Sequence, residues 1–292
     1  MADSTDKIDL HLHTNKSDGR LTPTELVRLV HQGGVRRMAL TDHDTTAGVD
    51  EAIEEGKRRG VEVIPGVELG TDGRSGDMHM LGLFLDYHDQ QFQETMARFR
   101  EGRIARVHKI VSNLAEVGVN ISVDRVFEIA GEASVGRPHV AQALLEAGYV
   151  TAMPEAFEKW LAYGGPGDVP RDKLSPEEAI EMIHRVGGLA VVAHPYEGKN
   201  VLDQLPGLAE AGLDGVETYY QSYGPDRVTE LLALGSKLGL LPTGGSDFHG
   251  FPLAGHEQVV NYPGSVEIPP SVLDALEARR QEQAGRADRA RP

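Results

Sequence analysis

Short apolar runs alternate along the chain with longer amphipathic stretches. The apolar runs are rich in Val, Ile, Leu and Met, have the length of strands, and span residues 7–12, 37–41, 61–67, 78–85, 189–194, 215–218 and 240–243. Helical periodicity lies between them, over residues 23–32, 48–59, 175–186, 202–211 and 225–238. Because strands that alternate with helices form parallel sheets with right-handed crossovers, we expect an α/β barrel or a doubly wound sheet.

The first helix has a clear start signal. Thr22 is a typical N-cap residue, and Pro23 suits the first helical position, where its missing N–H costs nothing. Glu25, three residues after the cap, completes a capping box with Thr22. These residues predict that the helix begins at Pro23.

Two parts of the chain break the alternation. Between residues 90 and 173 the pattern is helical, over 92–117, 138–147 and 154–163, and a turn cluster from Gly164 to Gly167 follows it. We therefore predict a barrel made of residues 1–89 and 174–278, interrupted by a helical insertion of residues 90–173. Residues 279–292 lack an apolar face and are predicted to be a fraying helix and a disordered tail.

Composition narrows the possible chemistry. The 292 residues include no cysteine and carry 29 basic and 45 acidic side chains, a formal net charge of −16. Disulfides, thiolate nucleophiles and iron–sulfur sites are excluded, so any metal must be bound by His and carboxylates. The acidic balance argues against a long nucleic acid bound by charge alone. The chain has neither an apolar run of about 18 residues nor a signal peptide, which predicts a cytoplasmic protein without a membrane partner.

Histidines and acids collect at the carboxyl ends of the predicted strands. His11 and His13 are two residues apart and therefore face the same way, and Asp247 and His249 repeat this spacing. The other members of the set are Asp18, His43, Glu68, His79 and His194. Any one of them could be an ordinary hydrogen-bonded residue. Since the carboxyl ends of parallel strands meet on one face, their joint placement favours a metal centre there.

These residues stand in motifs that resemble those of the PHP (polymerase and histidinol phosphatase) family of metal-dependent phosphoesterases. The motifs are His11-Leu12-His13, Ser17-Asp18-Gly19, Thr41-Asp42-His43-Asp44, Pro65-Gly66-Val67-Glu68, His79, Ala193-His194-Pro195 and Gly245-Ser246-Asp247-Phe248-His249. The resemblance covers nearly the whole chain and implies a distorted (β/α)7 barrel. It also implies a cluster of two or three divalent ions, with His11, His13, Asp18, His43, Glu68, His79, His194, Asp247 and His249 as ligands.

A chain of this length with a helical insertion after the fourth strand resembles the stand-alone enzymes of that family. The resemblance implies hydrolysis of nucleoside 3′,5′-bisphosphates, nucleoside monophosphates or short 5′-phosphorylated RNA, as in the 5′-3′ oligoribonucleases. A small phosphorylated substrate is then the expected partner. Histidinol-phosphate phosphatase activity is the alternative, because no residue excludes it. The oligomeric state stays open.

The chemistry of phosphate esters suggests roles within the set. Because a phosphate monoester is an anion that repels hydroxide, cations are needed to neutralise it and to activate water. Glu68 is expected to bridge two ions, and His194 and Asp247 are candidate general acids. Arg137 and His139, at the start of an insertion helix, are expected to bind the substrate as part of a lid. Mixed imidazole and carboxylate ligands favour Mn²⁺, with Zn²⁺ or Fe as alternatives.

Residues beside the motifs suggest supporting roles. Asp42 and Asp44 flank His43 and could orient neighbouring ligands or simply form a turn. Tyr219, Tyr220 and Tyr223 follow the sixth strand and could stack a base, although core packing explains them equally well.

Two other functional classes stay open. Amidohydrolase-like enzymes share the His-x-His motif but usually carry a lysine at a strand end, and we find none at the ends predicted here. A non-catalytic metal-binding module would be expected to lack ligands, whereas all nine positions carry Asp, Glu or His.

Overall fold

The computed structural model describes residues 7–74, 76–131, 133–162, 164–170, 173–250 and 261–290. Within this part of the chain seven strands form a single sheet whose spatial order is the order of the sequence. The strands are β1 (Lys7–Asp9), β2 (Val35–Leu40), β3 (Glu62–Gly73), β4 (Gly76–Leu83), β5 (Leu189–Val192), β6 (Gly215–Tyr220) and β7 (Leu241–Gly245). The predicted α/β architecture is confirmed.

Hydrogen bonds join the two edges of the sheet and make it a distorted barrel. The Leu10 N–H donates to the Gly244 carbonyl at 3.1 Å, and beyond the strands the Asp247 N–H donates to the His11 carbonyl at 2.9 Å. The chains lie so close here that a Cβ on Gly245 would stand 2.3 Å from the Cβ of His11. Barrel closure therefore requires glycine at position 245, directly beside a predicted metal ligand.

The prediction of a wholly parallel sheet is wrong for one strand. Strand β4 pairs antiparallel with both β3 and β5, while the other neighbouring strands pair in parallel. Only a short turn between Gly73 and Gly76 joins β3 to β4. Because a parallel connection needs a crossover of a dozen or more residues, this pair can only be a hairpin.

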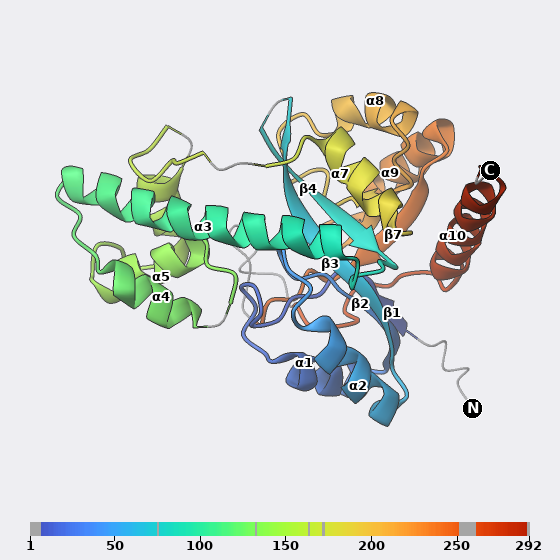
Figure 1. Cartoon of the computed structure of the whole chain (residues 1–292), viewed down its shortest axis with the longest axis horizontal. Helices are drawn as coiled ribbons and strands as arrows, with labels where there is room; N and C mark the ends of the chain where they lie inside the picture. Colours follow the sequence, from blue (N-terminus) through green and yellow to red (C-terminus); the bar gives the residue numbers. More distant parts are fainter. Residues whose placement is uncertain are drawn as a thin grey trace.

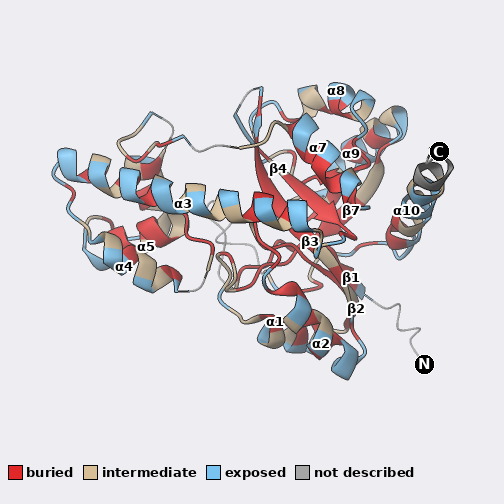
Figure 2. Ribbon diagram, viewed as in Figure 1, coloured by how far each residue is buried: buried red, intermediate tan, exposed pale blue. Residues whose placement is uncertain are grey.

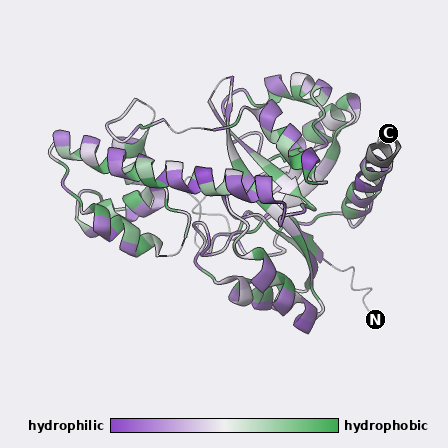
Figure 3. Cartoon of the chain, in the orientation of Figure 1, coloured by the Kyte–Doolittle hydropathy of each residue, from purple (hydrophilic) through white to green (hydrophobic). Residues whose placement is uncertain are grey.

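Helices pack around the sheet and bury its apolar residues, leaving their hydrophilic faces outward (Figures 2 and 3). These helices are α1 (Pro23–Gln32), α2 (Val49–Arg59), α7 (Pro176–Arg185), η2 (Leu202–Gln204), α8 (Leu205–Glu210), α9 (Pro225–Leu238) and α10 (Ser271–Ala290). The predicted start of α1 is confirmed, because Thr22 and Glu25 form the capping box and Pro23 is the first residue.

Between β4 and α7 the chain forms a second helical unit with a core of its own. It comprises α3 (Gln90–Glu116), α4 (Val123–Ala130), α5 (Arg137–Glu146), α6 (Met153–Ala156) and a π-helical turn η1 (Phe157–Leu161). Helix α3 belongs to both units, because Phe92 and Met96 pack in the barrel core whereas Ile110 and Leu114 pack in the insertion core. At about 1.5 Å per residue, this helix spans roughly 40 Å and projects the insertion from the barrel (Figure 1).

The carboxyl-terminal segment differs from the predicted disordered tail. Helix α10 continues to Ala290, and residues 291 and 292 lie outside the described part of the chain. Arg279 and Gln283 hold the helix to the barrel through the buried Asp214, with the Gln283 amide nitrogen 2.6 Å from Asp214 Oδ1. Polar contacts therefore order a segment that has no apolar stripe. Among the described helices, none is long and apolar enough to cross a bilayer.

The close approach of β1 and β7 predicts the effect of a single methyl group. Gly245→Ala would push against His11 and should lower the free energy of unfolding by about 1–3 kcal/mol, the usual cost of overpacking, and should also weaken metal binding. Thermal melts and elemental analysis measure the two effects. Gly102→Ala in α3 is the matched control, because nothing lies within 4 Å of its added Cβ. Equal melts and metal contents for both variants would contradict the requirement for glycine.

Candidate metal centre

The predicted ligands meet around one buried carboxylate, that of Glu68 on β3. Five imidazole nitrogens lie close to its two oxygens. Oε2 lies 3.2 Å from His11 Nε2, 3.1 Å from His13 Nε2 and 3.1 Å from His43 Nδ1, and Oε1 lies 2.8 Å from His79 Nδ1 and 3.0 Å from His194 Nε2. Residues from five strands or the loops that follow them thus reach one point.

Two aspartates complete the cluster on either side of Glu68. Asp247 Oδ1 lies 3.3 Å from His11 Nε2 and 3.1 Å from His13 Nε2. Asp18 Oδ1 lies 3.3 Å from His249 Nε2, and its Oδ2 lies 3.7 Å from His43 Nε2. The structure therefore brings all nine residues implied by the motifs into one cluster.

The arrangement fits divalent ions better than it fits hydrogen bonds alone. Within the described residues, both ring nitrogens of His13 and the Nδ1 atom of His79 have no hydrogen-bond partner, although a Glu68 oxygen lies 3.1 Å from His13 Nε2 and another lies 2.8 Å from His79 Nδ1. Nitrogens that approach a carboxylate without hydrogen-bond geometry point at a common position, as ligands of one ion do. Three overlapping groups have ligand atoms within 4.8 Å of one another: His13, Asp18, His43 and His249; His11, His13, Glu68 and Asp247; and His43, Glu68 and His79. Imidazole with carboxylate suits Mn²⁺, Fe²⁺ or Zn²⁺.

The electrostatics of the cluster also favour cations. Burial opposes ionisation of Glu68, but the imidazoles of His43 and His11 hold its pKa well below the usual range. Burial likewise acts on Asp247, whose pKa is nevertheless held low by His11 and His249. The carboxylates are therefore anionic at neutral pH. Burial lowers the pKa of His11 and His13, but the neighbouring carboxylates outweigh it and raise both values, so protons on these two imidazoles balance part of the negative charge, whereas burial lowers the pKa of His43 to about 3. Divalent ions can take the place of those protons, because metal binding displaces protons from its ligands.

The backbone is strained where the ligands leave the strands. Asp44, His194 and Asp247 have φ angles of 52°, 26° and 51°, which lie in the left-handed region that residues other than glycine avoid. Each such residue costs on the order of 1 kcal/mol and persists only where its surroundings impose it. The strained residues lie in the loops after β2, β5 and β7, and these loops place ligand side chains near Glu68.

Asp42 and Asp44 support the ligands from behind. Asp42 accepts hydrogen bonds from the Thr14 N–H and hydroxyl at 2.7 and 2.6 Å and from the Ser17 hydroxyl at 2.7 Å, which fixes the loop that carries His13 and Asp18. Asp44 accepts from Arg103 Nε at 2.8 Å and so ties α3 to the loop after β2.

Sequence reasoning missed one buried carboxylate in this support. Glu217 on β6 is fully buried, its Oε1 lies 3.0 Å from His11 Nδ1, and its Oε2 accepts the His194 backbone N–H at 2.7 Å. A carboxylate that holds the second ring nitrogen of a metal-binding histidine fixes its orientation. The sequence did hold a signal for this role, because Glu217 is an acidic residue inside a predicted strand.

A cationic cavity of about 180 Å³ adjoins the cluster on the side of the insertion. Asp18, His43 and His79 line it together with Asp77, Arg103, Arg106, Arg137, Pro138, Phe157 and Lys173. Asp77 lies between two of the cations, with Arg137 Nη2 at 3.6 Å and Lys173 on its other oxygen.

The other predicted substrate residue, His139, is placed differently from Arg137. His139 is buried, and its Nδ1 accepts the Gly136 N–H at 3.0 Å, a contact that caps α5. The described lining of the cavity includes Arg137 but not His139. The geometry therefore gives His139 a local role at the start of α5, and its contact with substrate stays a prediction.

Comparison with known proteins shows similarity over most of the chain. Residues 9–163 match the PHP domain family. The 5′-3′ exoribonuclease Rnm of Escherichia coli K12 is 36% identical over 247 residues, which cover 82% of this chain and 84% of that protein. A 3′,5′-nucleoside bisphosphate phosphatase of Chromobacterium violaceum is 33% identical, with 83% and 87% covered. A crystal structure from Bifidobacterium adolescentis, provisionally named a metal-dependent phosphoesterase, has a TM-score of 0.83 and 30% identity, with 94% of this chain and 96% of that chain covered.

The position of Glu68 between the other ligands predicts that its loss affects the binding of more than one ion. Glu68→Gln keeps the shape of the side chain but removes the charge that balances the surrounding imidazoles. We expect elemental analysis of manganese-loaded protein to show at least one ion fewer per chain than in the parent, with the remaining ions bound more weakly. Glu62→Gln, an exposed position at the start of β3, is the control. Unchanged metal content in Glu68→Gln would show that Glu68 does not hold the ions.

Proposed function

The chain belongs to the PHP family and is a metal-dependent phosphoesterase, and we propose that its substrates are phosphate esters of small nucleotides. These would be nucleoside 3′,5′-bisphosphates, nucleoside monophosphates or short 5′-phosphorylated RNA, hydrolysed by a metal-activated water. The observation that carries the proposal is the cationic cavity that opens beside the metal ligands. The names of the exoribonuclease and of the bisphosphate phosphatase support it.

The residues of the cluster divide the chemistry between them. When bound, divalent ions neutralise phosphate oxygens and lower the pKa of a coordinated water from about 15.7 toward 7. Glu68 offers one oxygen to each side of the cluster, so it would hold neighbouring ions in common. Glu217 fixes the ring of His11 from behind and the backbone of His194. These contacts support a preformed site, in which the side chains need little reorganisation during the reaction.

Protonation of the leaving alcohol falls to His194 or Asp247, the two predicted general acids. Both oxygens of Asp247 are engaged, Oδ1 near His11 and His13 and Oδ2 with the Tyr220 hydroxyl at 2.8 Å. The His194 side chain is 15% exposed and contacts Glu68 through Nε2. The greater exposure of His194 favours it as the residue that protonates the leaving group at the mouth of the site.

The charge of the cavity discriminates between substrates. Four of its described lining residues are cationic, Arg103, Arg106, Arg137 and Lys173, and two are acidic, Asp18 and Asp77. A nucleoside bisphosphate carries a second phosphate that such cations would bind. Histidinol phosphate carries an ammonium group instead, which the same cations would repel. The cavity therefore favours nucleotides over the histidinol-phosphate alternative, and its presence beside complete metal ligands disfavours a non-catalytic module.

The proposal predicts which esters release phosphate. Manganese-loaded protein should hydrolyse 3′,5′-bisphosphoadenosine and short 5′-phosphorylated RNA, measured as phosphate or nucleotide release, in preference to histidinol phosphate. His194→Ala should lower kcat/KM by about 100-fold or more, as expected for loss of a proton donor. His108→Ala, an exposed histidine in α3, is the control. Turnover of histidinol phosphate alone would refute the nucleotide assignment, and inactivity of metal-loaded protein toward all three substrates would count against the proposed substrate class.

A separate prediction concerns Arg137 in the cationic cavity. Arg137→Ala should lower kcat/KM for the bisphosphate about 10-fold or more without loss of bound metal, because a charge-assisted contact to phosphate is removed. Steady-state kinetics and elemental analysis on the same sample measure the two quantities. Arg125→Ala, an exposed arginine of the insertion, should behave as the parent. Identical kinetics in Arg137→Ala and Arg125→Ala would remove Arg137 from the substrate site.

A further inference from the structure

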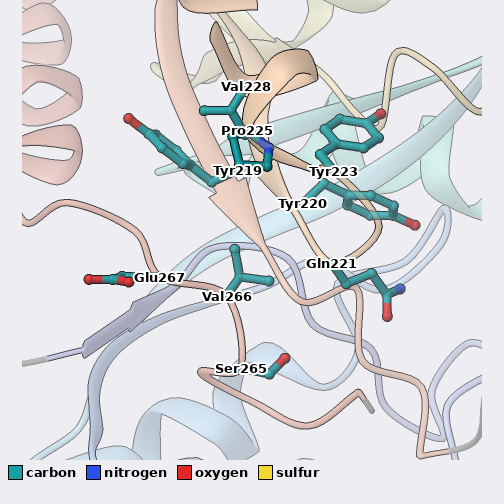
Figure 4. Close-up of a pocket in the computed structure, with 9 residues that line it drawn as sticks. All are labelled: Tyr219, Tyr220, Gln221, Tyr223, Pro225, Val228, Ser265, Val266 and Glu267. Atoms are coloured by element: carbon teal, nitrogen blue, oxygen red, sulfur yellow. The ribbon is translucent and has the colours of Figure 1, made fainter. Parts of the chain in front are cut away.

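A second cavity, of about 400 Å³, lies at the carboxyl end of β6 and has a different chemistry (Figure 4). Tyr219, Tyr220 and Tyr223 contribute to its walls, and Val228 of α9 and Val266 add apolar surface. None of the described residues that line it is cationic. The volume falls within the usual range of small-molecule sites, about 300–1,000 Å³. An aromatic lining in which no described residue is cationic suits a planar organic group rather than a phosphate.

Tyr220 lines this cavity and also contacts two residues of the metal centre. The Tyr220 hydroxyl donates to Asp247 Oδ2 at 2.8 Å, and the ring centroids of Tyr220 and His194 lie 5.7 Å apart. The cationic cavity contacts the cluster elsewhere, through Asp18, His43 and His79. The metal ligands thus separate a cationic cavity from an aromatic one.

Polar atoms in the aromatic cavity have unused hydrogen-bonding capacity. Within the described part of the chain, Gln221 Nε2 and Ser265 Oγ are buried atoms without a hydrogen-bond partner, and both residues line the cavity. A buried donor left unpaired is destabilising, so such atoms need a partner from outside the protein, either water or a bound molecule. Glu267, also in the lining, can accept hydrogen bonds but would repel a phosphate. Amide, hydroxyl and carboxylate groups around aromatic rings are the set that recognises the edge and face of a heterocyclic base.

We propose that this cavity binds the nucleobase of the substrate while the metal centre holds the ester phosphate. The inference rests on the proposed function, because it concerns the same substrate and the same site. The tyrosine rings supply stacking surface, which every base can use, and Gln221 and Ser265 supply hydrogen bonds to its edge. The enzyme then recognises a nucleotide from two sides, by charge in one cavity and by stacking in the other.

The first test fills the cavity and compares two substrates. Val228→Trp places a large ring in the space assigned to the base, and Leu232→Trp, at an exposed position one turn further along α9, is the matched control. With manganese-loaded protein, Val228→Trp should lower kcat/KM for 3′,5′-bisphosphoadenosine about 10-fold or more, in line with the usual contribution of base stacking. Its kcat/KM for ribose 5-phosphate, which has no base, should stay that of the parent. Equal losses for both substrates, or no loss for either, would overturn the proposal.

A binding measurement tests the cavity without turnover. Calorimetric titration of manganese-loaded protein with adenosine should show binding that ribose does not show, and Val228→Trp and Gln221→Ala should each weaken it while Leu232→Trp does not. Thermal melts identify any variant that fails to fold, and Gln221→Ala then decides. Adenosine binding that is unchanged in both variants would overturn the base site. Absence of phosphate release in the parent protein, with adenosine binding intact, would instead refute the proposed function and leave the cavity assignment standing.

Discussion

The structure depends on one buried carboxylate, Glu68, and on the imidazoles that surround it. Five histidines lie within 3.2 Å of its oxygens in an interior where unbalanced charge is costly. A cluster of this kind is stable when protons or metal ions balance the carboxylates, and three carboxylates among six histidines leave room for several ions. Burial, high charge density and missing hydrogen bonds at His13 and His79 all fit a metal centre.

The fold supplies the rigidity that such a cluster needs. Barrel closure brings His11 against Gly245, so that the first and last strands position ligands together. The β3–β4 hairpin pairs Gly70 with His79, which places His79 diagonally across from Glu68, with its Nδ1 2.8 Å from Glu68 Oε1. Helix α3 crosses from barrel to insertion, and its Arg103 is fixed by Asp44, so the cations of the insertion face the metal ligands. The barrel thus supplies the candidate metal ligands, and the insertion places cations beside them.

Local signals in the sequence predicted much of this and missed what depends on tertiary pairing. The capping box at Thr22, the seven strands and most ligand positions beyond strand ends follow from short-range pattern, and the structure has them. Glu68 and His79 are exceptions to the predicted strand-end placement, because they lie within β3 and β4. Strand direction does not follow from apolar periodicity, which is why β4 was expected to be parallel. Helix α10 beyond Arg279 is ordered by polar contacts to Asp214, a residue 65 positions away in the sequence. Glu217 escaped notice for the same reason, because its partners His11 and His194 become neighbours only in the folded barrel.

We propose that neighbouring metal ions share Glu68 in the hydrolytic centre. The most direct measurement is a crystal structure of manganese-loaded protein with anomalous difference maps. We expect at least two manganese peaks, with both Glu68 oxygens within coordination distance of an ion. A single peak that Glu68 does not contact would contradict the sharing of Glu68. So would the absence of any peak among the nine ligands in protein that turns over substrate.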